Sequence, residues 1–465
     1  MDAFYGVYNL LWGDLFEIPL PGGSSLGLSL LVLILIPAGL YFTVRTRFLP
    51  FRLFPQMLRV TLENNRKTHI QGISGLQALI VSTACRVGMG NLVGVVAAIS
   101  AGGAGAVFWM WLIALLGSAT AFIEATLAQM YKEKDPLYGG YRGGPAYYLH
   151  YLFVGRKGKK GKSLIACLFA LSGLICWCGI SQVTANSISA SFENAFQIPP
   201  LYSTTALVIV AAVIVLRKNA TVRVLDIMVP VMAACYFFVT VLIIVTNIGL
   251  LPDVIRQIFA QAFGLEQAVG GGIGAVIMNG VKRGLFSNEA GSGSAPCAAA
   301  AADVSHPAKA GLLQSLGVFI DTLVICSCTA MIMLMTPKSL TEGLEGMDLL
   351  QASMSYHLGE AGVIFIAVIL WLFSFSTFLG ILFYARSNVA YLFGDNWTAQ
   401  SLYKILCLAM LFAGGLAAYQ FVWDLGDVGI GLMTVFNMAG LFALAPKALA
   451  SLRDYQEKEM KRRKN

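Results

Sequence analysis

The chain has 465 residues, of which 57% are apolar and only 12% are charged, and its formal net charge is +8. A soluble domain has about a quarter of its residues charged, so this composition excludes an ordinary water-soluble protein. The 48 glycines agree with closely packed transmembrane helices. We therefore predict an all-α polytopic membrane protein.

The first 24 residues do not have the pattern of a cleaved secretory signal, because they contain no Lys or Arg. A membrane-spanning helix needs about 20 mostly apolar residues, and eleven segments meet this requirement. They lie near residues 25–44, 74–101, 105–131, 164–190, 202–217, 226–247, 267–302, 309–335, 360–385, 402–420 and 427–446. Residues 252–264 are too few to span and predict an interfacial helix.

The basic residues predict the orientation of these spans. One set of alternate loops holds 27 of the 32 Lys and Arg residues, whereas the opposite set holds Arg256 and Lys338. Cytoplasmic loops carry the excess of Lys and Arg. We therefore expect a multi-pass protein of the cell (inner) membrane, with its N-terminus outside and its C-terminus in the cytoplasm. The basic tail, KEMKRRKN, suits anionic lipid headgroups, and we expect no nucleic-acid partner.

Two predicted spans are interrupted by glycines and polar residues. Segment two reads STACRVGMGNLVGV, and segment seven reads IMNGVKRGLFSNEAGSGSAP. Each begins a run of five spans, and because five is odd the second run enters the membrane from the opposite side, as in an inverted repeat. The predicted regions are residues 1–73 with an extra helix and a basic linker, 74–250 and 251–446 as the two repeats, and 447–465 as the tail.

The chemistry of an unwound helix suggests what such breaks hold. Lipid cannot supply partners for the freed backbone groups, so a ligand must do so unless the glycines serve only close helix packing. Freed amides at a half-helix end suit a carboxylate, and freed carbonyls suit a dehydrated sodium ion. A pair of breaks can therefore hold both ends of an amino acid.

Buried ionisable residues also indicate function. We expect Arg86 to pair with an acidic residue such as Glu289, and Lys282 and Arg283 to line the inner vestibule, to snorkel or to take part in gating. Glu124 and Asp321 are expected at helix contacts or gates. Glu289 is the candidate coupling residue if protons rather than sodium drive transport of the bound ligand. The CxC pairs at 176/178 and 326/328 are expected to be packing residues.

The sequence resembles the alanine or glycine:cation symporters, also called the sodium:alanine symporter family. The matching strings are GMGNLVGVVAAISAGGAGAVFWMWLIALLGSATAFIEATLAQMY (88–131), YRGGPAYYL (141–149), GVKRGLFSNEAGSGSAP (280–296) and FSFSTFLGILFYAR (373–386). The resemblance implies a LeuT-type fold with two discontinuous helices and sodium-coupled import of a small neutral amino acid, alanine or glycine first. It implies no cofactor besides the coupling ion.

The resemblance also assigns roles to residues. The substrate carboxylate would lie at Gly88, Met89 and Gly90, with Asn91 behind them. The ammonium side would lie at a second break containing Asn279 and Gly280, and Gln182 would face the same cavity. For sodium, the resemblance implies carbonyls of Ala84, Val87 and Phe373 with the hydroxyls of Ser376 and Thr377.

The sequence departs from the family pattern at two of these positions. Met89 replaces the usual threonine, and Ile381 replaces the usual tryptophan. Both changes could reshape the pocket, so glutamine, serine or another neutral amino acid stays open as substrate. An enzyme is not expected, since there is no HExxH or GxSxG string, and a passive channel would differ in showing neither saturation nor sodium dependence. The oligomeric state stays open.

Overall fold

The computed structural model describes residues 2–19, 25–62, 73–154, 161–217, 220–264, 272–341, 343–344, 346–417 and 419–464. Residues 63–72 of the predicted basic linker lie outside this part. Helices dominate the chain, and the strands occur in short pairs. The strands are β1 (Phe16–Pro19), β2 (Ser25–Leu28), β3 (Ile73–Ser74), β4 (Glu133–Lys134), β5 (Tyr141–Arg142) and β6 (Ala302–Asp303).

Each of the eleven predicted segments contains a helix, although residues 25–28 of the first form β2 and the helix there begins at Leu30. In the first half they are α1 (Asp2–Trp12), α2 (Leu30–Arg45), α3 (Leu49–Arg52), α4 (Phe54–Leu62), α5 (Gly75–Arg86), η1 (Gly90–Gly94), α6 (Val95–Gly102), α7 (Gly105–Met130), α8 (Pro145–Val154), α9 (Leu164–Phe196), α10 (Pro200–Val215), α11 (Ala220–Thr246), η2 (Ile248–Leu250) and α12 (Leu251–Ala262). In the second half they are α13 (Ile273–Asn288), α14 (Ala295–Ala301), α15 (Pro307–Val318), η3 (Phe319–Cys326), α16 (Ser327–Leu334), η4 (Lys338–Leu340), α17 (Gly346–Leu358), α18 (Glu360–Phe393), α19 (Trp397–Gly415) and α20 (Tyr419–Lys464).

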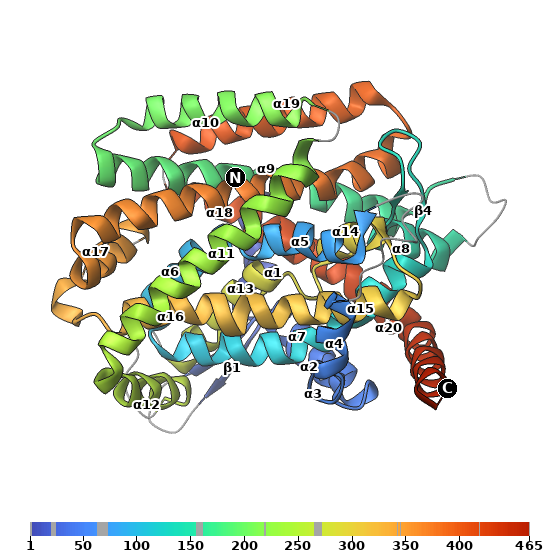
Figure 1. Cartoon of the computed structure of the whole chain (residues 1–465), viewed down its shortest axis with the longest axis horizontal. Coiled ribbons are helices and arrows are strands. Elements are labelled where there is room, and N and C mark those ends of the chain that lie inside the picture. Colours follow the sequence, from blue (N-terminus) through green and yellow to red (C-terminus); the bar gives the residue numbers. More distant parts are fainter. Residues whose placement is uncertain are drawn as a thin grey trace.

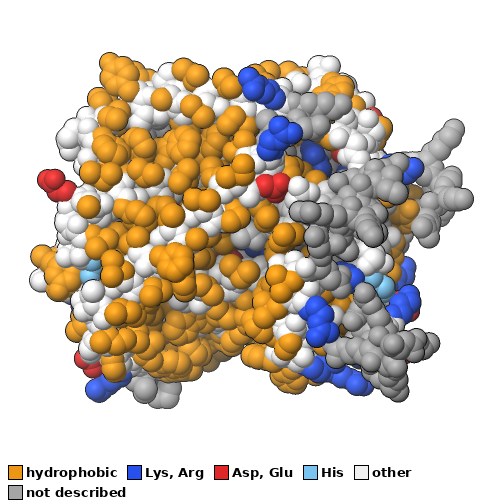
Figure 2. Space-filling view, in the orientation of Figure 1, with side chains coloured by type: hydrophobic (Ala, Val, Ile, Leu, Met, Phe, Trp, Pro, Cys, Tyr) orange, Lys and Arg blue, Asp and Glu red, His pale blue; other side chains and the backbone are white. Residues whose placement is uncertain are grey.

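Length and composition make this an all-α polytopic membrane protein, as predicted. Within the described residues, six helices are long and apolar enough to cross a membrane, and the bent pair α5 with η1 and α6 makes a seventh. The long helices run roughly side by side, with the end of α20 projecting from one end of the molecule (Figure 1). Figure 2 shows hydrophobic side chains over most of this face, with Lys and Arg gathered mainly toward the end from which α20 projects.

Both predicted interruptions exist as breaks in the helices. The first span bends by 47° between α5 and the segment that begins at Gly90. The second span stops at Asn288 and resumes at Ala295. Between them, Gly291 (φ +91°) and Gly293 (φ +86°) adopt backbone conformations that favour glycine.

The helices pack in two groups around these breaks. The helix α7 packs against α13, α14 and α15, whereas α9 packs against α18, α19 and α20. The helix α5 contacts α18 and so bridges the groups. The short parallel ladder β3–β6 pairs Ile73 with Ala302 and Ser74 with Asp303, which joins the start of the first broken span to the end of the second.

Candidate substrate and cation site

The first break frees backbone groups for other partners. In an unbroken helix the amide of Gly88 would donate to the carbonyl of Ala84. Instead it donates to Arg86 O at 2.9 Å and to Asn91 Oδ1 at 2.8 Å. Val87 is the last residue before this change of direction and caps α5 with φ −74° and ψ 75°.

Four of the oxygens predicted to hold sodium converge beside this break. Ser376 Oγ donates to Ala84 O at 3.0 Å and to Phe373 O at 2.8 Å. Thr377 Oγ1 donates to Phe373 O at 3.0 Å. All four residues are buried. Two backbone carbonyls and two hydroxyls thus face one another across α5 and α18, which is a donor set that suits a hard monovalent cation.

The same hydroxyl contacts the predicted substrate segment. The amide of Met89 donates to Thr377 Oγ1 at 3.2 Å. A Cβ at Gly88 would lie 1.9 Å from that oxygen, so only glycine permits the approach. On the other side, Met89 Sδ lies 3.8 Å from Thr184 Oγ1 of α9. Met89 therefore lies where α5, α9 and α18 meet.

Asn91 connects the two broken spans. Its Nδ2 donates to Asp321 Oδ1 at 2.7 Å and lies 3.3 Å from Ser287 Oγ near the end of α13. Ser287 Oγ in turn donates to Asp321 Oδ2 at 2.9 Å. Gly90 packs on the same turn, since a Cβ there would lie 3.2 Å from the Cα of Ser287.

Asp321 is a fully buried carboxylate in the π-helical segment η3. Hydrogen bonds from Asn91, Ser287 and Thr322 satisfy its side chain. No Lys or Arg of the described chain pairs with it. Because π-helical turns occur often at functional sites, this junction belongs to the candidate site as well.

The structure corrects the predicted position of the second break. Asn279 and Gly280 lie inside the continuous helix α13, and the break is at residues 289–294. Asn279 Nδ2 donates to Ala275 O one turn earlier, and a Cβ at Gly280 would lie 2.5 Å from Cβ of Trp109. Gly284 meets Ile113 of α7 in the same way, so these glycines serve close helix packing.

Gln182 faces away from the predicted cavity, which is a second correction. Its Nε2 lies 3.2 Å from Met410 Sδ of α19. Thr184, two residues later and therefore on nearly the opposite side of α9, is the residue that meets Met89. Ile381 is fully buried on α18, one turn beyond Thr377 and on the same face.

The predicted pair between Arg86 and Glu289 is absent from the described chain. Arg86 is fully buried and its Nη1 donates to Gln314 O at 3.1 Å. Glu289 Oε2 accepts from Tyr384 Oη of α18 at 3.2 Å. The two charges are near enough to interact electrostatically, but each side chain is held by a neutral group.

Glu124 braces the second break. Its Oε1 accepts from the amide of Gly291 at 3.3 Å, and its Oε2 accepts from Asn437 Nδ2 at 3.0 Å. Asn437 Nδ2 also donates to Gly291 O at 2.9 Å, and Tyr148 donates to Asn437 Oδ1. Glu124 thus satisfies an unwound backbone, in agreement with its expected role at a helix contact.

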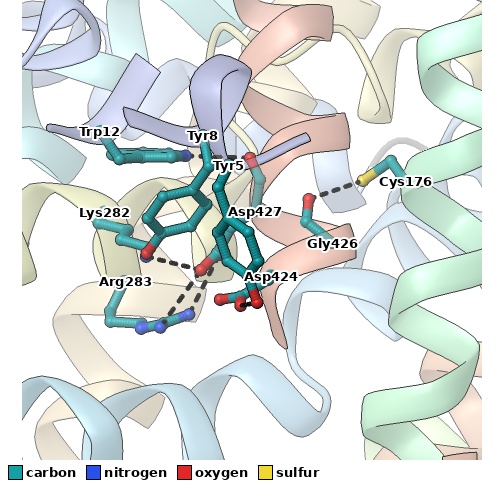
Figure 3. Close-up of polar contacts among 9 residues, drawn as sticks. All are labelled: Tyr5, Tyr8, Trp12, Cys176, Lys282, Arg283, Asp424, Gly426 and Asp427. Atoms are coloured by element: carbon teal, nitrogen blue, oxygen red, sulfur yellow. Dashed lines mark hydrogen bonds and ion pairs between the residues drawn. The ribbon is translucent and has the colours of Figure 1, made fainter. Parts of the chain in front are cut away.

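Lys282 and Arg283 converge on Asp427 of α20 (Figure 3). Lys282 Nζ lies 2.6 Å from Asp427 Oδ2, and Arg283 Nη1 lies 3.2 Å from Oδ1. Asp427 has a side chain only 1% exposed. This buried ionic cluster joins α13 of one helix group to α20 of the other.

The N-terminal helix α1 covers the cluster. Lys282 Nζ donates to Tyr8 Oη at 2.7 Å and lies over the Tyr8 and Trp12 rings at 4.8 and 5.4 Å. Trp12 Nε1 donates to Asp427 O at 3.0 Å. Lys282 and Arg283 therefore lie on the side of the molecule that α1 covers.

Several residues of the site were missed from sequence alone. No motif singled out four of them: Thr184, Tyr384, Asp427 and Asn437. Asp427 carried one usable signal, because an acidic residue in an apolar span needs a partner. Of the CxC cysteines, Cys326 Sγ lies 3.1 Å from Ser287 Oγ, so that pair touches the junction as well as packing.

Comparison with known proteins places the chain in a family. A family model described as "Sodium:alanine symporter family" matches residues 23–465. The "Probable sodium/glutamine symporter GlnT" of Bacillus subtilis is 42% identical over 92% of this chain and 88% of its own length. The "Sodium/alanine symporter AgcS" of Methanococcus maripaludis is 33% identical over 94% and 96%. A crystal structure of the Eremococcus coleocola manganese transporter covers 86% of this chain and 79% of its own, with a TM-score of 0.54 and 10% identity.

Proposed function

Because the chain belongs to the sodium:alanine symporter family, we propose that it carries a small neutral amino acid into the cell together with sodium ions. The observation that carries the proposal is the contact between the two candidate sites. Thr377 Oγ1 lies in the oxygen cluster and also accepts from the amide of Met89 in the first break. One hydroxyl therefore serves both the cation and the substrate segment.

In the proposed cation site, sodium is bound by Ala84, Val87, Phe373, Ser376 and Thr377. The four oxygens that converge across α5 and α18 support this assignment. Sodium would also hold α5 against α18 and so join the two helix groups. Sodium binding would then favour the arrangement in which the two helix groups lie together, because a ligand favours the state in which its contacts are complete.

The substrate site is proposed at the first break, with Gly88, Met89, Gly90 and Asn91, and beside Ile381. Freed amides there suit the carboxylate of an amino acid. The corrected second break, residues 289–294, is the proposed partner for the other end of the substrate in place of Asn279 and Gly280. Alanine and glycine come first as substrates, while the glutamine named for one relative supports glutamine as the alternative.

Transport is proposed to follow alternating access in a LeuT-type fold of two five-helix repeats, residues 74–250 and 251–446. The two broken spans and the two helix groups support this assignment. Lys282, Arg283 and Asp427 are proposed to close the outer side. Eleven spans, with the N-terminus outside, complete the proposal.

Proton coupling is the second candidate. Glu289 and Asp321 are buried carboxyl groups held by neutral donors, and no Lys or Arg in the described part of the chain pairs with either. A carboxyl group in such a place can bind and release a proton. The names of two relatives mention sodium or proton dependence together with alanine, which agrees with keeping this alternative.

Uptake into proteoliposomes separates these possibilities. Radiolabelled alanine is supplied with an inward sodium gradient, with potassium in place of sodium, or with an inward proton gradient, and unlabelled glycine, serine and glutamine compete. Saturable uptake that requires sodium supports the symporter, and the best competitor identifies the substrate. Uptake that ignores sodium but follows the proton gradient would contradict the sodium site and favour Glu289 or Asp321.

A further inference from the structure

A cavity of about 380 Å³ opens at the end of the molecule where α10, α11, α18 and α19 meet the loop after α7. In the predicted orientation this is the cytoplasmic end. Its lining combines apolar, aromatic and basic side chains: Ile73, Tyr138, Gly139, Gly140, Tyr141, Val215, Thr221, Val222, Ala301, Leu382, Phe383, Arg386 and Lys404. None of the residues assigned to the substrate or cation site lines it.

Two cations of this cavity, Arg386 and Lys404, have hydrogen-bond donors that no described residue engages. The guanidinium of Arg386 lies over the Phe383 ring at 3.6 Å and over the Tyr138 ring at 5.1 Å. Its Nε is buried and has no hydrogen-bond partner among the described residues. Lys404 Nζ lies over the same Tyr138 ring at 5.6 Å and donates to Val215 O at 3.0 Å. No carboxylate of the described chain forms an ion pair with either.

The acidic groups around the cavity are already engaged. Asp135, on the loop that carries Tyr138, accepts from the amides of Leu137 and Tyr138 at 3.0 and 3.1 Å. Asp226 of α11 accepts from Gln77 Nε2 at 2.9 Å. Asp395 pairs with Arg142.

A further basic residue lies beside the cavity. Lys132 Nζ donates to Ala302 O at 2.8 Å and lies 4.0 Å from the Tyr141 ring centroid. The side chain of Asp303 interacts with it electrostatically. Asp135 likewise interacts electrostatically with Arg386, but within the described chain neither Arg386 nor Lys132 forms an ion pair with a carboxylate.

We propose that this cavity binds a phosphate group, supplied by the headgroup of an anionic lipid or by free phosphate. Arg binds phosphate through several directed hydrogen bonds, and basic pockets between membrane helices on the cytoplasmic side suit phosphate headgroups. The cavity is larger than one phosphate needs, which leaves room for the glycerol of a headgroup. Exposed Leu216, directly after α10, and exposed Leu402 of α19 offer apolar surface to acyl chains nearby.

A phosphate group bound in this cavity would affect the movement of the two broken spans. Ile73 precedes α5 and Ala301 ends α14, so a bound phosphate group would lie against the ends of both half-helices as well as α18 and α19. It would therefore favour the arrangement in which these ends stay together. The site does not depend on the identity of the transported substrate.

Thermal unfolding of the purified protein in detergent tests the site without sodium or amino acid. Phosphatidylglycerol, phosphatidylcholine, inorganic phosphate and chloride at matched ionic strength are added separately. We expect phosphatidylglycerol to raise the unfolding temperature while phosphatidylcholine and chloride do not. A rise with inorganic phosphate as well assigns the site to free phosphate, and no rise with either phosphate source overturns the proposal.

Two cavity variants and one control variant test whether the stabilisation arises in this cavity. Arg386→Gln is expected to raise the concentration for half-maximal stabilisation at least about tenfold, since a charge-assisted contact is lost. Lys404→Gln, which removes the less enclosed cation, should weaken the effect in the same direction and serves if Arg386→Gln does not fold. Arg453→Gln, at an exposed position of α20, should leave it unchanged. Stabilisation that persists in both cavity variants overturns the assignment.

Discussion

Gly88 shows how one missing side chain permits the candidate site. Its hydrogen occupies the space where a Cβ would lie 1.9 Å from Thr377 Oγ1. Gly88→Ala should push this hydroxyl away from the oxygen cluster, and overpacking of this kind costs about 1–3 kcal/mol. We expect sodium-driven uptake to fall at least about tenfold.

A glycine of the same broken span supplies the control. A Cβ at Gly94 would meet nothing within 4 Å, and its backbone is helical, so Gly94→Ala should retain uptake. Both variants are measured at equal amounts in the membrane. Uptake by Gly88→Ala within twofold of the parent protein would contradict the proposed approach of Thr377 to the break.

Asp427 balances two buried cations. Removing one partner of a buried ionic group typically costs about 3–5 kcal/mol, because the remaining charge is left uncompensated. Asp427→Asn should therefore lower the unfolding temperature of the purified protein clearly. Asp424→Asn, one turn earlier, changes a side chain that accepts a long hydrogen bond from Tyr5 at 3.4 Å and interacts with Lys282 and Arg283 without an ion pair, so it should lower the temperature less. Equal effects of the two variants would show that the cluster does not stabilise this side.

Sequence reasoning reached some of these residues and missed others for physical reasons. The string GMGN marked the first break because two closely spaced glycines and a polar residue are unfavourable in a continuous helix. Gly280 and Gly284 gave a similar signal, yet they pack closely against α7 inside α13. Gln182 failed because a polar residue in an apolar helix does not reveal which side it faces. Contacts between distant helices decided these cases.

At the scale of elements, the N-terminal helix α1 covers the ionic cluster of Lys282, Arg283 and Asp427. It places Tyr8 and Trp12 over Lys282, whose side chain is only 7% exposed. Deleting residues 2–12 should expose Lys282 to an amine reagent that does not cross membranes, added from outside to whole cells. Labelling is read by mass spectrometry of the peptide that contains residue 282.

A control on the cytoplasmic side completes that experiment. Lys447 lies on α20 directly after the predicted span 427–446, at the other end of that span from Asp427, and should stay unlabelled in intact cells, both before and after the deletion. Labelling of Lys282 that does not rise on deletion would contradict the covering role of α1. Helix existence followed from apolar length, but this cover did not, because residues 2–12 are too short to span and carried no motif.

At the scale of the whole molecule, the distribution of charge predicts the orientation. A reporter that is active only in the cytoplasm should be active when fused after residue 465 and inactive when fused after residue 339, beside Lys338. The reverse pattern would show that the chain is inverted and that the ionic cluster lies inside. The all-helical membrane class and the family were predicted correctly, because apolar runs and family strings are local features of the sequence.

Equilibrium binding of the transported amino acid to the purified protein, measured over a range of sodium concentrations, tests the link between the two sites most directly. Thr377→Val is compared with Thr434→Val, a buried threonine whose hydroxyl donates to Ile430 O of its own helix at 2.7 Å. We expect binding to require sodium in the parent protein and in Thr434→Val, and Thr377→Val to need at least about tenfold more sodium. Binding by Thr377→Val with an unchanged sodium requirement would contradict a cation site that shares this hydroxyl with the substrate segment.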